Sequence, residues 1–268
     1  MMNVAGKTAL YHKLVYEVRY EQGLVYLDRC GTTANQIVQS NPEWIIPENA
    51  ISPQGAPLVN AVSGTQFTFG PLKYDFALNQ PVGRESALTP ADVQLFISHV
   101  ESVTSIVHRE LDLKTFLREG FRVWYLFATD SEEDSQDWLA ALGAFKTNHS
   151  VISAFGGKLE SETHIAVVAA RDRKFRVAVS AVERQEILDL GTEALKTLPR
   201  RLAKGQRELV LQQLRARRRI LSNPEFAVMI DVDAYVENPV EIAPSDFIRR
   251  SLEAIEAGIP KALARGDS

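Results

Sequence analysis

The chain has 268 residues, of which 45% are hydrophobic and 24% charged, and its formal net charge is −4. These values are typical of a globular protein with a substantial core and exclude a disordered chain. No segment approaches the roughly 20 consecutive apolar residues of a membrane-spanning helix, and the first residues lack the apolar run of a secretory signal. Cys30 is the only cysteine, which excludes an intrachain disulfide and a four-thiolate zinc site. We therefore expect a soluble cytoplasmic protein that does not enter a membrane.

The first third of the chain contains mostly extended segments. Alternation of large apolar and polar residues predicts a strand at Leu14–Tyr20. Thr32 or Thr33 is expected to cap a short helix that ends before Pro42. Four prolines between Pro42 and Pro57 indicate an irregular connection. Two antiparallel strands are predicted next, Pro57–Ser63 and Thr65–Leu78. Gly70-Pro71 interrupts the second of them, where a turn or bulge is expected.

The residue pattern in the middle of the chain predicts a long helix followed by a central strand. Thr89 can cap the helix, Pro90 fits its first position, and Asp92 can reach back to the cap. The segment Phe121–Ala128 is apolar apart from Arg122, which is typical of a strand covered on both faces. An acidic turn then starts a helix that carries Trp138, Leu139 and Leu142.

The last 100 or so residues repeat this order of elements. A charged four-residue loop joins two strands into a hairpin, two helical segments follow, and a long apolar strand precedes an amphipathic C-terminal helix. In chain order these are Thr163–Ala170, Phe175–Val182, Leu188–Leu198, Gln206–Leu221, Phe226–Val236 and the helix after Pro244.

The repeated order predicts an α+β fold with an internal duplication. We expect two related β-β-α-β-α units, residues 1–146 and 147–268, with mainly antiparallel sheets packed against helices. No low-complexity tract separates the two halves. They are therefore expected to pack closely, without a flexible linker, and their seam is the expected place for a ligand.

Asp231 and Asp233 form the most enzyme-like pattern in the sequence. Alternate residues of a strand point to the same face, so both carboxylates share a face and Glu237 continues the row. Carboxylates placed in this way can hold a divalent cation, which predicts a metal-dependent hydrolase as one alternative. On the simpler interpretation the acids occupy the solvent side of a strand whose other side is apolar.

A basic block is the main electrostatic anomaly. Nine basic residues and one acid lie between Lys196 and Arg219, on a chain whose total charge is negative. A helix in this block could bind nucleic acid phosphates, although it has no aromatic residue for stacking on bases. A helix face that pairs with the acidic remainder of the chain, or with a second subunit, explains the block equally well, and plain solvated charge is the remaining alternative. The candidate partner-binding residues are Arg207, Arg215, Arg218 and Arg219.

The whole pattern resembles a sporadically distributed family of uncharacterised prokaryotic proteins. The residues that carry the resemblance are Val15–Tyr20, the aromatic strand Phe121–Tyr125, and Ile230-Asp231-Val232-Asp233 ahead of a C-terminal helix. The mid-chain strand departs from that family's usual ending, because it ends Leu126-Phe127-Ala128. The resemblance implies a fold and no established activity, so it supplies no catalytic residues.

The sequence contains no converging catalytic set. It lacks the glycine-rich nucleotide motifs, the serine-hydrolase elbow and the usual histidine spacings of a metal site. We therefore expect a non-catalytic binding or protein-interaction module without a cofactor, with a protein partner or a second copy as its ligand. Four aromatic residues are candidates for lining a pocket: Tyr16, Tyr20, Tyr74 and Trp124.

Overall fold

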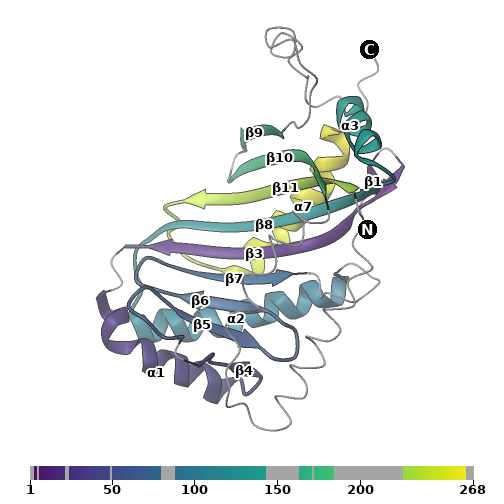
Figure 1. Ribbon diagram of the computed structural model, residues 1–268. Coiled ribbons are helices and arrows are strands. Elements are labelled where there is room, and N and C mark those ends of the chain that lie inside the picture. Colours follow the sequence, from purple (N-terminus) through teal and green to yellow (C-terminus); the bar gives the residue numbers. More distant parts are fainter. Residues whose placement is uncertain are drawn as a thin grey trace, which may run out of the picture.

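The computed structural model describes residues 3–4, 6–21, 24–48, 50–79, 88–142, 163–170, 172–183 and 226–263. Within them, nine strands form one sheet in the order β4-β5-β6-β7-β3-β8-β11-β10-β9, and all neighbours are antiparallel (Figure 1). The strands of this sheet are Leu10–Tyr20 (β3), Trp44–Ile45 (β4), Ala56–Asn60 (β5), Gln66–Phe69 (β6), Lys73–Asn79 (β7), Phe116–Thr129 (β8), Thr163–Ala169 (β9), Lys174–Glu183 (β10) and Phe226–Glu237 (β11). Two short strands, Asn3–Val4 (β1) and Lys7–Thr8 (β2), pair separately.

The helices cover one face of the sheet. They are Leu24–Ser40 (α1), Pro90–Leu111 (α2), Glu132–Ala141 (α3) and Pro244–Ala262 (α7). In Figure 1, α1 and α2 lie behind the strands of the first half, and α7 crosses behind β8 and β11. The α+β prediction, with antiparallel strands packed against helices, is thereby confirmed.

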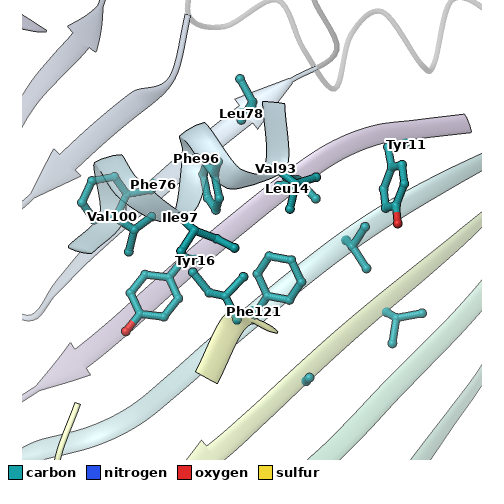
Figure 2. Packing of buried hydrophobic residues seen from close by; sticks show 14 of the residues in the cluster. Tyr11, Leu14, Tyr16, Phe76, Leu78, Val93, Phe96, Ile97, Val100 and Phe121 are labelled. Atoms are coloured by element: carbon teal, nitrogen blue, oxygen red, sulfur yellow. The ribbon is translucent and has the colours of Figure 1, made fainter. Parts of the chain in front are cut away.

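The core forms where α2 meets the central strands. Val93, Phe96, Ile97 and Val100 line one side of α2 and pack against large side chains of β3, β7 and β8 (Figure 2). The start of α2 has the predicted capping box, because the Thr89 hydroxyl accepts from the Asp92 amide and the Asp92 carboxylate accepts from the Thr89 amide. Burial of this apolar stripe, at about 25 cal/mol per Å², is what holds the helix to the sheet.

The first helix ends before Pro42 as predicted, but its predicted start was wrong. α1 begins at Leu24, so Thr32 and Thr33 lie in its middle and cap nothing. The side chain of Thr33 is fully buried, in a stripe with Tyr26, Ala34 and Ile37. The Tyr26 hydroxyl also donates to the Ser52 carbonyl at 2.6 Å, which ties the first turns to the loop before β5. Tertiary packing therefore extends a helix whose local sequence gives no clear start signal.

Most other strand predictions agree with the structure, but β8 begins at Phe116 and not at Phe121, and the described helices cover only one of its faces. β3, the turn between β6 and β7, the β9–β10 hairpin and β11 lie where the sequence patterns placed them. The predicted helices at 188–198 and 206–221 fall outside the described residues. In the part of the chain that the structure describes, no helix is long and apolar enough to cross a membrane.

The internal duplication is not confirmed. The first half contributes β3 to β8 and the second half contributes β9 to β11 to the same continuous sheet, joined by the β8–β11 pair. In the first half β3 lies between β7 and β8, whereas in the second half β10 pairs directly with β11. The division into units 1–146 and 147–268 remains a prediction.

Candidate functional site: the charged face of the sheet

The face of the sheet opposite the helices carries charged side chains from five adjacent strands. Strand register places them together: Glu17 stands opposite Asp75, and Asp233 stands opposite both Arg122 and Arg176. Since residues directly opposite each other point to the same face, these side chains form one surface. We call it the charged face, and its residues are Glu17, Arg19, Lys73, Asp75, Arg118, Arg122, Arg176, Asp231 and Asp233.

Asp231 is the most enclosed acid of this face. Arg122 donates to it with two parallel hydrogen bonds, from Nε to Oδ1 at 2.6 Å and from Nη2 to Oδ2 at 2.5 Å. Arg176 Nη1 adds a longer contact of 3.3 Å to Oδ2. The hydrogen bonds to Asp231 raise the pKa of Arg122. A planar guanidinium matches a carboxylate in this way, so the pair is fixed in geometry as well as in charge.

Arg118 joins two further acids in the centre of the face. Its Nη2 donates to Asp233 Oδ2 at 2.6 Å, and its Nη1 donates to Glu17 Oε1 at 3.0 Å. Glu17 also accepts from Arg19 Nε at 2.7 Å and from Lys73 Nζ at 3.0 Å. β3, β7, β8 and β11 are thus linked by one chain of ion pairs.

Burial and ion pairing have opposite effects on the pKa values of these acids. Burial alone would raise the pKa of Glu17, but the hydrogen bonds from Lys73 and Arg19 outweigh it and hold that pKa below its usual range. For Asp233, burial is the larger effect and raises its pKa despite the attraction of Arg118 and Arg122. Burial also raises the pKa of Asp75, against the attraction of Lys73.

Gly120 makes room for the Arg118 side chain. A Cβ atom at Gly120 would lie 2.7 Å from Arg118 Nη1 and 3.0 Å from its Cζ. The guanidinium therefore lies directly over the glycine backbone on its way to Glu17 and Asp233. Any side chain at this position would force the Arg118 guanidinium to shift.

The ion pairs are layered, with the acids beneath and the cations above. The acid side chains are 6% (Asp231), 15% (Glu17), 19% (Asp233) and 28% (Asp75) exposed. Four of the cations are more exposed, namely Arg122 (40%), Arg176 (35%), Lys73 (51%) and Arg19 (55%). Arg118 is the exception, at 18%. A molecule that approaches the charged face therefore meets mainly positive groups.

The aromatic residues of this face already have cationic neighbours. Lys13 Nζ lies 4.4 Å from the centre of the Trp124 ring, and the Arg122 guanidinium lies 5.1 Å from it. Tyr235 has the Arg118 guanidinium at 4.8 Å. Trp124 is only 6% exposed. These rings are occupied by cation–π contacts and are not free platforms for a stacked base.

The candidate site residues predicted from the sequence have different surroundings in the structure. Asp231 and Asp233 each bind an arginine, and Glu237 accepts from Lys174 at 2.6 Å at the end of β11. Both aspartates lie on the face away from the helices, as the simpler interpretation expects, but Asp231 is buried there beneath Arg122 and Arg176. Among the described residues, no group of three or more histidine, cysteine, aspartate or glutamate side chains is placed to hold a metal ion. Four predicted partner-binding residues lie outside the described residues: Arg207, Arg215, Arg218 and Arg219.

A second polar cluster, absent from the sequence predictions, lies in the core on the helix side. Glu119 is 3% exposed and accepts from the Tyr16 hydroxyl at 2.7 Å. Tyr74 lies beside Tyr16 and its hydroxyl is 2.8 Å from His108 Nε2. Burial raises the pKa of Glu119 to about 7 and lowers the pKa of His108 to about 4. Tyr16 and Tyr74 are therefore core residues with hydrogen-bonded hydroxyls, not the lining of an open pocket.

The signal for Glu119 was available in the sequence. Glu119, Phe121 and Val123 share one face of β8, so continuing the alternation two residues upstream of the predicted strand places a carboxyl in the core. Tyr20, another predicted pocket residue, is also buried, and its hydroxyl donates to the Gly70 carbonyl.

Comparison with protein-family models and with curated proteins finds no match for this chain.

Proposed function

We propose that this chain is a non-catalytic cytoplasmic binding protein, and that its charged face takes an acidic segment of a partner protein. The layering of the ion pairs carries this proposal, because the cations are exposed while their acids are largely covered. Arginine donates in parallel pairs to carboxylates, which suits aspartate and glutamate side chains of a partner. The cytoplasmic location is part of the same proposal and rests on the single cysteine.

A protein partner fits this surface better than nucleic acid. Sheet surfaces that bind single strands combine basic groups with free aromatic rings. Here Trp124 and Tyr235 have cationic side chains against them, so base stacking would first require those contacts to break. The carboxylates of an acidic partner, in contrast, can bind the exposed cations without displacing the groups that cover these rings.

An acidic peptide probe tests the proposal. A fluorescein-labelled, glutamate-rich peptide should bind the wild-type chain, with an anisotropy signal that weakens as salt rises. The variant Arg19→Gln/Lys73→Gln/Arg176→Gln removes three outward cations of the charged face. We expect it to weaken binding at least about tenfold, which corresponds to roughly 1.4 kcal/mol.

A matched control removes the same charge from the other side of the molecule. Arg109, Lys114 and Arg249 are exposed basic residues on or near the helices. The variant Arg109→Gln/Lys114→Gln/Arg249→Gln should bind the peptide like the wild type. Equal weakening by both triple variants would show a nonspecific charge effect and overturn the proposal. Preferential binding of a single-stranded oligonucleotide over the peptide would favour the nucleic-acid alternative instead.

A further inference from the structure

The last strand of the sheet, β9, has an exposed apolar edge. Thr163–Ala169 pairs with β10 on one side, and among the described residues no strand pairs with its other side. Ile165, Val167 and Val168 are 55%, 59% and 54% exposed. The strand contains no lysine, glutamate, arginine, aspartate or proline, which are the residues that normally protect a sheet edge. The opposite edge of the sheet, β4, is only two residues long and presents little to pair with.

Strand geometry shows which backbone groups of β9 point outward. The Ala170 amide donates to the Arg173 carbonyl at 2.9 Å, so this opposed pair is a hydrogen-bonded one. Hydrogen-bonded pairs recur at every second residue of an antiparallel ladder, which places Val168, Ala166 and His164 in bonds to β10. The amides and carbonyls of the alternate residues therefore point away from the sheet: Thr163, Ile165, Val167 and Ala169.

This outward edge is complementary to itself. If two copies of β9 run antiparallel about a two-fold axis at Ala166, Ile165 of one copy lies opposite Val167 of the other. Thr163 then lies opposite Ala169, so every outward-pointing residue meets an outward-pointing residue and about eight backbone hydrogen bonds can form. Ile165 and Val167, which oppose each other in this pairing, are both apolar, and β9 contains no acidic or basic residue other than histidine.

We propose that β9 pairs with β9 of a second copy, joining the two sheets into one. The contact is isologous, as expected for a homodimer. A second copy fits better than a charged partner, because the strand has no charge for a partner of either sign to recognise. A contact of one strand lies at the low end of specific interfaces, near or below about 1,200 Å² in total, so we expect a weak dimer.

The proposal is independent of the one for the charged face, since it concerns the edge of the sheet. It has one consequence for that face. A two-fold axis perpendicular to the joined sheet leaves both charged faces on the same side, where one extended acidic partner could reach both.

Charge placement on β9 provides the test. Sedimentation equilibrium on the full chain, up to roughly 100 μM, should show a monomer–dimer equilibrium for the wild type. The variants Ile165→Lys/Val167→Lys and Ile165→Glu/Val167→Glu each place like charges opposite one another and should be monomeric. An equimolar mixture of the two should form a heterodimer, because each introduced lysine then faces an introduced glutamate.

The control variant is Leu24→Lys/Leu27→Lys, which changes two exposed leucines of α1. It should dimerise like the wild type, and circular dichroism should show that all variants are folded. The mixed-charge rescue separates strand pairing from a general effect of solubility. A monomeric wild type at the highest concentration would overturn the proposal and would point to a strand of another protein as the occupant. Unchanged dimerisation of the two like-charge variants would overturn it as well.

Discussion

Replacing Glu119 by glutamine should stabilise the protein at alkaline pH and leave it nearly unchanged at acid pH. Burial raises the pKa of this carboxyl from 4.5 to about 7, so the folded state resists its ionisation while the unfolded state does not. The contribution of Glu119 to the stability of the wild type should therefore fall as the pH rises from about 4.5 to about 7 and then level off, with a total loss of roughly 3 kcal/mol. Glutamine keeps an oxygen that can accept from the Tyr16 hydroxyl at its observed 2.7 Å and carries no charge to bury.

Urea denaturation at pH 5 and pH 8 measures this effect. Glu119→Gln should exceed the wild type by about 3 kcal/mol at pH 8, with most of the difference gone at pH 5. His108, whose pKa burial lowers to about 4, destabilises the fold at low pH, but it does so in both proteins and cancels in the difference. Glu253→Gln, on the exposed side of α7, is the matched control and should stay near the wild type throughout. A difference between Glu119→Gln and the wild type that is constant from pH 5 to pH 8 would show that the pKa of Glu119 is not raised by burial.

Three further substitutions test individual contacts by chemical denaturation. Arg122→Ala leaves Asp231 buried with only a 3.3 Å contact to another arginine, and it should lower the free energy of unfolding by about 3–5 kcal/mol. The double variant Arg122→Met/Asp231→Leu removes both charges and should be close to neutral. Equal losses of stability in the two variants would contradict the pairing. Gly120→Ala should displace the arginine above it and cost about 1–3 kcal/mol, and a crystal structure with Arg118 unmoved would disprove this. Thr89→Ala removes the α2 cap and should cost about 1 kcal/mol, while Thr89→Ser should retain most of it.

The sequence predicted the elements whose signals are local. The capping box at Thr89 and Asp92 lies within four residues, and the alternation in β3 and β11 repeats over many residues. The predicted start of α1 was wrong because its N-terminal turns depend on tertiary contacts, such as the hydrogen bond from Tyr26 to Ser52, that leave no local signature. The order of elements in the two halves did not determine how the strands pair.

The site was predicted in part. The Asp231 and Asp233 pattern identified the right strand and the right face, because side-chain alternation is fixed by the backbone. Their partners, Arg118 and Arg122, are more than 100 residues away, and only the β8–β11 register brings them within reach. That register depends on the whole sheet, so an acidic pair that suggests a metal site in sequence can instead be neutralised by arginines in the fold.

Binding of an acidic partner to the charged face is tested most directly by titrating the full chain, with labelled backbone amides, with the acidic peptide and following the titration by NMR. We expect the chemical-shift changes to concentrate on the strands of the charged face: β3, β7, β8, β10 and β11. The exposed helix surfaces of α1, α2 and α7 should remain unperturbed. Shifts confined to those helices, or none on the strands at saturating peptide, would contradict it.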